Sequence, residues 1–126
     1  MKSMIISAIL IAIVIWGSAA YTGTLEKVSS ELIEINSQIS SKLSNDDFNG
    51  AMQDIERLEE YIDSKNTFLS AMNNHAELDN IEMNLAELKR YTEGGAHTDA
   101  ISKSSVLNFL FAHLPKNYKL RLENIL

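Results

Sequence analysis

A long uncharged stretch at the amino terminus constrains this chain more than any other feature. No residue from Ser3 to Leu25 carries a charge, and the part from Met4 to Trp16 is almost entirely apolar. About 20 helical residues, at about 1.5 Å each, cross a hydrocarbon layer of about 30 Å. Residues 3–21 are therefore just long enough to span a membrane. The side chains expected to face lipid are Met4, Ile5, Ile6, Ile9, Leu10, Ile11, Ile13, Val14, Ile15 and Trp16.

The ends of this stretch predict its orientation. Lys2 and the terminal amine precede it, which favours a cytoplasmic amino terminus, and Trp16 lies toward the other end, where amphipathic rings prefer the membrane interface. We expect residues 1–23 to form a transmembrane anchor and residues 24–126 to form one extracytoplasmic domain. A cleaved signal peptide remains an alternative, because residues 17–20 are small and their cleavage would leave a secreted helical protein. A buried helix of a soluble protein is a further alternative.

The rest of the chain is acidic and lacks cysteine. Lys2 is the only charged residue before Glu26, so the chain from Glu26 onward contains 10 Lys and Arg and 17 Asp and Glu. Such a charge repels phosphate backbones, so we expect no nucleic-acid partner. Without cysteine there is no disulfide, thiolate metal site or cysteine nucleophile. Since phosphate-binding glycine loops, serine elbows and zinc helices are also missing from the sequence, we expect no enzyme and no cofactor.

Apolar residues repeat at helical spacing through the acidic region. A first stripe follows the anchor at steps of three and four residues, which places its members on one face of a helix. Its members are Leu25, Val28, Leu32, Ile35 and Ile39. A second helix is predicted from Asp46 to about Met72, with Ser44 or Asn45 as its cap. A break of this helix near residues 64–66 is an alternative.

Two further helices follow. One ends at Gly94-Gly95, where glycine tolerates the left-handed cap conformation, and the next begins at His97 or Thr98 and is closed by Pro115. The many carboxylates of the second helix indicate that the face carrying them is exposed to solvent. These are Asp54, Glu56, Glu59, Glu60 and Asp63.

The pattern repeats weakly at an offset of 49 residues, so that Leu32 corresponds to Ile81 and Leu58 to Leu107. This repeat has a faint likeness to tetratricopeptide (TPR) hairpins, but two units fall short of a stable array. We therefore predict an all-α fold: an amino-terminal transmembrane helix followed by a four-segment antiparallel bundle of two hairpins.

Two apolar surfaces are predicted to contact a partner, either a membrane protein or a second copy of the chain. One is the stripe Leu25–Ile39, and the other is the carboxyl-terminal segment, which alternatively folds back onto the bundle. The apolar residues of that segment are Leu120, Leu122, Ile125 and Leu126.

Histidines suggest one further possibility. If the last two helices pair antiparallel, residues whose numbers sum to about 189 lie side by side, which brings His75 close to His113. With Asp79 one turn from His75, these side chains could hold a divalent metal such as zinc. The alternative is that the histidines are structural.

Several segments together carry a resemblance to a known family. They are Asn45-Asp46-Asp47-Phe48, His75-x-x-Leu78-Asp79-x-Ile81, Leu107-x-Phe109-Leu110-x-x-His113-Leu114-Pro115 and the ending Leu122-Glu123-Asn124-Ile125-Leu126. With the apolar amino terminus, they resemble the bacterial family of unknown function DUF4363. The resemblance implies a helical domain anchored in the bacterial cytoplasmic membrane, working beside a small multi-spanning membrane protein, and implies no reaction.

Overall fold

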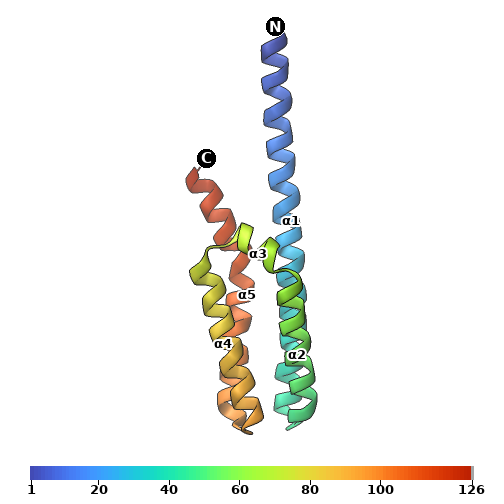
Figure 1. Cartoon of the computed structure of the whole chain (residues 1–126), viewed down its shortest axis with the longest axis vertical. Coiled ribbons are helices and arrows are strands. Elements are labelled where there is room, and N and C mark those ends of the chain that lie inside the picture. The colour runs from blue at the N-terminus through green and yellow to red at the C-terminus, as the bar shows by residue number, and fades with distance from the viewer. Residues whose placement is uncertain (126) are drawn as a thin grey trace.

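The fold is entirely helical in the part of the chain that the computed structural model describes. That part is residues 1–125, with the side chains of residues 18–22 and 117–126 left out of the description. The helices are α1 (Lys2–Ser44), α2 (Phe48–Ser64), α3 (Asn66–Met72), α4 (His75–Glu93) and α5 (His97–Ile125), shown in Figure 1. The predicted all-α bundle is thereby confirmed.

Two helical hairpins lie side by side. α1 pairs with α2, α4 pairs with α5, and the short α3 lies between the hairpins at the upper end of the bundle in Figure 1. α1 and α5 make the most extensive interface, although they come from opposite ends of the chain, whereas α2 and α4 contact each other at few points. The amino-terminal turns of α1 project beyond the other helices (Figure 1).

The turn between α1 and α2 differs from its prediction. Asp46 takes a left-handed backbone conformation, with φ of 59°, so it belongs to the turn and the second helix begins two residues later than expected. Its cap is Asp47, whose carboxylate accepts a hydrogen bond from the Gly50 amide at 3.0 Å. This bond satisfies one of the free amides at the start of α2.

The helix boundaries at Lys65, Asn74 and Gly95 follow the sequence signals. The predicted break in the second helix is confirmed, because Lys65 separates α2 from α3. α4 is capped by Asn74, which accepts from the Glu77 amide at 2.8 Å. After α4, Gly95 has φ of 70°, the left-handed conformation that its lack of a side chain permits.

Pro115 does not end the last helix, so this prediction was wrong. A proline lacks the amide that would bond to the carbonyl four residues earlier, here that of Phe111. The hydroxyl of Ser29 on α1 donates to this carbonyl at 2.6 Å and replaces the missing bond. α5 therefore continues past Pro115 to Ile125.

The core runs along the middle of the bundle and takes residues from every helix. Its buried apolar members are Leu25, Val28, Leu32, Ile39, Leu43, Ala51, Ile55, Leu58, Leu69, Met72, Ile81, Leu85, Leu88, Ala100, Leu107, Phe111 and Leu114. Positions related by the 49-residue offset, such as Leu32 and Ile81, are buried alike.

A membrane-spanning helix is not found among the helical residues whose side chains are described, because none of these helices is both long enough and apolar enough. The predicted span, residues 3–21, is therefore not shown, and its carboxyl-terminal part lies in the undescribed stretch 18–22.

Candidate functional site

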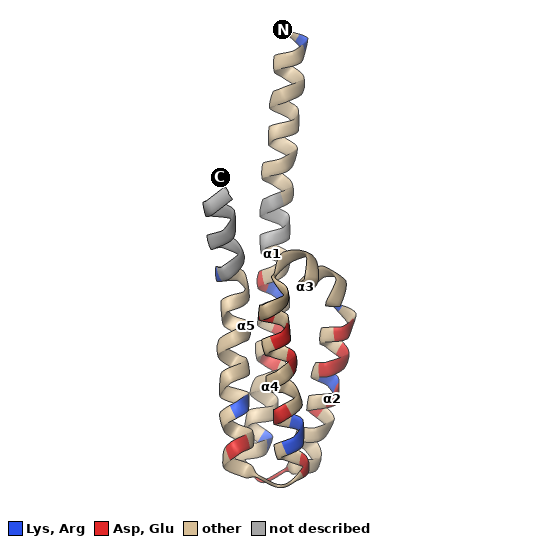
Figure 2. Ribbon diagram, turned by 60° about the vertical axis from the view of Figure 1, so that its left-hand side comes forward, with Lys and Arg blue, Asp and Glu red and all other residues tan. Residues whose placement is uncertain are grey.

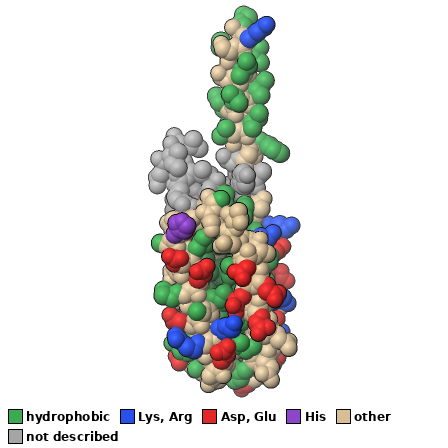
Figure 3. Space-filling view, in the orientation of Figure 1, with side chains coloured by type: hydrophobic (Ala, Val, Ile, Leu, Met, Phe, Trp, Pro, Cys, Tyr) green, Lys and Arg blue, Asp and Glu red, His purple; other side chains and the backbone are tan. Residues whose placement is uncertain are grey.

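The most unusual surface of the molecule is the apolar start of α1. The ten large apolar residues from Met4 to Trp16 are 54% to 75% exposed. They project away from the bundle (Figure 3). They are the residues that the sequence predicted to face lipid. An exposed apolar surface of this kind marks an interaction site for lipid or protein.

Acidic residues are concentrated on two helices. α2 and α4 together contain ten Asp and Glu against three Lys and Arg, so they carry a net charge of −7, whereas the rest of the chain sums to +1. Figure 2 shows this red colouring along both helices. The two helices that form the most extensive interface, α1 and α5, are thus nearly neutral, and the acidity lies on their flanking partners.

A groove separates α2 from α4, because these helices contact each other at few points. The groove has a volume of about 430 Å³. It is lined by Glu59, Ile62, Asp63, Glu82, Leu85, Ala86, Lys89, Arg90 and Glu93. Hydrophobic side chains lie between the acidic side chains of the two helices in Figure 3. We call this feature the acidic groove.

One ion pair crosses the acidic groove. Lys89 on α4 reaches Glu59 on α2, with 3.1 Å between Nζ and Oε1. The hydrogen bond to Glu59, its charge and the nearby Glu93 and Glu56 carboxylates raise the pKa of Lys89 above its ordinary value. Because both partners are more than one-third exposed, this bridge adds little to stability. The carboxylates of Asp63, Glu82 and Glu93 remain exposed around it.

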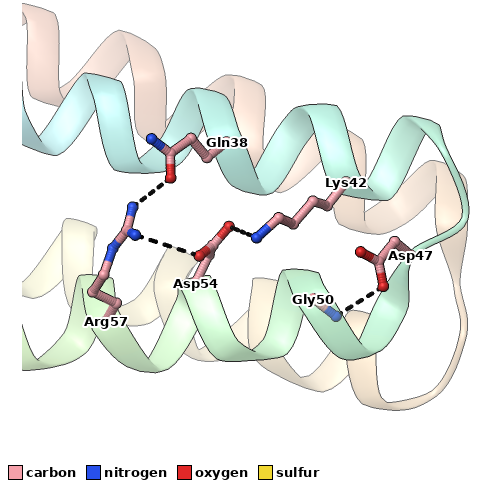
Figure 4. A network of polar contacts seen from close by, with 6 residues as sticks. All are labelled: Gln38, Lys42, Asp47, Gly50, Asp54 and Arg57. Carbon is pink, nitrogen blue, oxygen red and sulfur yellow. Dashed lines mark hydrogen bonds and ion pairs between the residues drawn. The ribbon is translucent and has the colours of Figure 1, made fainter.

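Asp54 corrects the prediction that the carboxylates of the second helix are all solvated. Its side chain is only 7% exposed and lies 2.6 Å from Nζ of Lys42 on α1. Arg57 is 3.7 Å from its other oxygen and also bonds to Gln38 of α1 (Figure 4). This network joins α1 to α2 and is structural, since its charges are directed at one another. Its sequence signal is position: Asp54 falls on the same helical stripe as Ala51 and Leu58, which are buried.

The histidines occupy separate settings. The Nδ1–H of His113 donates to the Phe109 carbonyl at 2.8 Å, and the two rings lie with centroids 3.9 Å apart. His113 also lines a cavity of about 280 Å³ with Glu77, whereas His75 is exposed and is not among its lining residues. Among the described residues, no three His, Cys, Asp or Glu side chains are grouped so that they could hold a metal ion. The candidate trio of His75, His113 and Asp79 is therefore not grouped in this way.

The two predicted partner surfaces have different outcomes. The stripe Leu25–Ile39 packs into the bundle itself: four of its residues are buried, and Ile35 is partly buried against the core. It is therefore not a free surface of the bundle, and its contact with a partner stays a prediction. The apolar residues of the carboxyl-terminal segment, Leu120, Leu122, Ile125 and Leu126, lie outside the described side chains.

The antiparallel register of α4 and α5 agrees with the prediction. Lys103 on α5 pairs with Glu87 on α4 at 2.8 Å, and their numbers sum to 190 against the predicted 189. On the other side of α5, Asn36 of α1 bonds to Ser104. Each face of α5 is thus held in place by a defined polar contact.

These features define a small antiparallel helical-bundle protein with a projecting apolar helix and an acidic outer groove. Residues 20–125 match the family described as a domain of unknown function, DUF4363. The chain belongs to this family, which confirms the resemblance drawn from its sequence. No curated protein and no solved structure matches the chain.

Proposed function

We propose that this protein is a membrane-tethered, non-enzymatic accessory module, in which the apolar start of α1 inserts into a lipid bilayer and holds the acidic bundle beside it. One observation carries the proposal: ten large apolar side chains stand exposed on a helix that continues into the bundle. Transfer of such a side chain from water to an apolar environment is favourable by about 1.5–3 kcal/mol. Ten together supply ample driving force for insertion, even after the cost of ordering.

The charge pattern supports a defined orientation. Lys2 precedes the apolar segment, and positive charge favours the cytoplasmic side. We therefore propose that the amino terminus faces the cytoplasm of a bacterium and that the bundle lies outside its cytoplasmic membrane. Ser37 is exposed on α1, so Ser37→Cys gives the otherwise cysteine-free chain a single label site. A membrane-impermeant maleimide should label it in intact spheroplasts. Labelling only after lysis would reverse the orientation.

The proposed role of the bundle is binding rather than catalysis. Its best-buried polar groups hold helices together: Asn36 bonds to Ser104, and Asp54 pairs with Lys42. The acidic groove, in contrast, faces outward and is open. Its position away from the core makes it available to a partner protein at the membrane.

Lipid vesicles without any other protein test the tether. The purified full chain should float with phosphatidylcholine vesicles in a density gradient and resist extraction by alkaline carbonate. If the chain reached the membrane only by binding a partner protein, it would stay at the bottom of the gradient. Recovery in the carbonate supernatant would contradict insertion.

A pair of charged substitutions sharpens the test. Ile9→Asp with Ile13→Asp changes two exposed residues of the apolar segment, so the bundle is untouched. Each aspartate costs about 2.5–3.5 kcal/mol at the centre of a bilayer, so the fraction of the chain that floats and resists carbonate extraction should fall. The matched control, Ser30→Asp with Ser37→Asp, adds the same charge at exposed bundle positions and should float as the parent does. Equal flotation of both variants would contradict the proposal.

A further inference from the structure

We propose that the acidic groove between α2 and α4 binds a cationic amphipathic helix of a partner protein. This inference names the partner class of the accessory module proposed above, but it does not depend on membrane insertion. It rests on the shape of the groove, its apolar floor and the charge around it.

The shape suits a helix. α4 contributes lining residues from Glu82 to Glu93, a length of about 17 Å at about 1.5 Å per residue. An antiparallel pair of helices that contact each other at few points leaves a trough in which a third helix can lie.

The floor is apolar. Ile62 of α2 and Leu85 of α4 line the groove, and Ala86 adds a small exposed side chain that leaves the trough open. Ile62 also lines an apolar gap that reaches Phe111 and Leu32 in the core. A partner that presents a row of aliphatic side chains at i, i+3 and i+4 therefore finds an apolar surface beneath it.

The charge selects a cation. Four carboxylates line the groove against the two cations Lys89 and Arg90, so the lining carries a net charge of −2, and its two helices carry −7. The carboxylates of Asp63, Glu82 and Glu93 are exposed. Basic side chains flanking the apolar row of a partner would pair with these carboxylates. The negative electrostatic field around the acidic groove raises the association rate of such a cationic partner. A second copy of this chain would bring the same acidic helices to the interface, which like-charge repulsion disfavours.

The test uses a synthetic probe of stated composition. It is a fluorescein-labelled peptide of about four turns, with leucine at i, i+3, i+4 and i+7 and lysine elsewhere. Binding to the full chain in detergent micelles is followed by fluorescence anisotropy, with empty micelles subtracted. A shuffled peptide of equal composition and a peptide with glutamate in place of lysine serve as controls. Only the cationic amphipathic peptide should bind.

Two variants locate the binding. Ala86→Trp fills the trough from an exposed position and should weaken binding about tenfold, which corresponds to about 1.4 kcal/mol. Glu82→Gln should weaken it several-fold and reduce its sensitivity to salt. The controls are Ala76→Trp, exposed on α4 outside the groove, and Glu34→Gln, exposed on α1; neither should change the affinity.

Three results would overturn the inference. Equal binding of the shuffled or glutamate peptide would mean that the amphipathic pattern or the charge is irrelevant. Binding that Ala86→Trp leaves unchanged would place the peptide elsewhere on the acidic surface. Self-association that Ala86→Trp abolishes, measured by sedimentation equilibrium, would make a second copy the occupant. None of these depends on whether the chain floats with vesicles, so failure of the tether is recognised separately.

Discussion

The hydroxyl of Ser29 donates to the carbonyl of Phe111 at 2.6 Å, across the interface between α1 and α5. This carbonyl is the one that Pro115 leaves without an intrahelical donor. A side chain from the first helix therefore repairs the last one. The contact lies in the most extensive helix interface of the bundle, where both groups are buried.

Removing the Ser29 hydroxyl should reveal this compensation. Ser29→Ala leaves a buried carbonyl unsatisfied and should lower the free energy of unfolding by about 1–3 kcal/mol. In a Pro115→Ala background, the new amide can bond to the Phe111 carbonyl, so the same change should cost less than about 0.5 kcal/mol. Urea titration in detergent micelles, followed by circular dichroism, measures both. Equal costs in the two backgrounds would show that the proline does not create the need for Ser29.

Asn36 and Ser104 should be similarly coupled. Asn36 Nδ2 donates to the Ser104 carbonyl at 2.8 Å, and Ser104 Oγ donates back to Asn36 Oδ1 at 3.0 Å. Asn36→Ala removes both bonds in a buried interface and should cost about 2 kcal/mol. Ser37→Ala, at the next and exposed position, should stay within about 0.5 kcal/mol of the parent. A cost for Asn36→Ala as small as that of Ser37→Ala would refute the coupling.

The Lys42–Asp54 pair predicts an asymmetry. Asp54 is buried and Lys42 is more than one-third exposed, so removing the lysine leaves the buried carboxylate with the more distant Arg57 at 3.7 Å, whereas the freed lysine can reach water. Lys42→Met should therefore destabilise the protein by about 1–3 kcal/mol, more than Asp54→Leu does. The double variant should recover most of the loss, because two apolar side chains of suitable size replace the pair. The unfolding free energies of the four proteins form a double-mutant cycle, and additive losses would contradict the account.

The Glu87–Lys103 pair predicts a pH dependence. The hydrogen bond and charge of Lys103 lower the pKa of Glu87, and the same bond raises the pKa of Lys103. A carboxyl group whose pKa is lower in the folded state than in the unfolded state stabilises the fold at any pH above its unfolded-state pKa. This contribution is lost as the pH falls through the folded-state pKa. Glu87→Gln should thus differ from the parent near neutral pH and converge with it below about pH 4. Thermal melting across this range measures the difference, and a gap that persisted in acid would contradict the assignment.

The local helical structure was predictable from the sequence, but its pairing was less so. The spacing of Leu25, Val28 and Leu32 predicted a helix because a 3.6-residue repeat places them on one face. It did not reveal that this face packs into the core of the bundle itself. Local periodicity specifies which face is apolar and leaves open what covers it.

The remaining errors concern contacts between distant residues. Pro115 is a helix-ending signal on local grounds, and Ser29, far away in sequence, supplies a donor to the carbonyl that the proline leaves unbonded. Asp54 belongs to an acidic helix, and its burial depends on Lys42 of another helix. The acidic groove depends on how far α2 stands from α4, which no repeat within either helix can specify.

Spin labels provide the most direct measurement of whether the apolar start of α1 lies in lipid. The chain contains no cysteine, so Ile9→Cys, Ile13→Cys and Glu34→Cys each accept one nitroxide. In phosphatidylcholine vesicles, labels at 9 and 13 should relax with dissolved oxygen and be shielded from a water-soluble nickel complex. The label at 34, on the exposed bundle surface, should show the reverse. Nickel accessibility at 9 and 13 equal to that at 34 would contradict the membrane-tethered account.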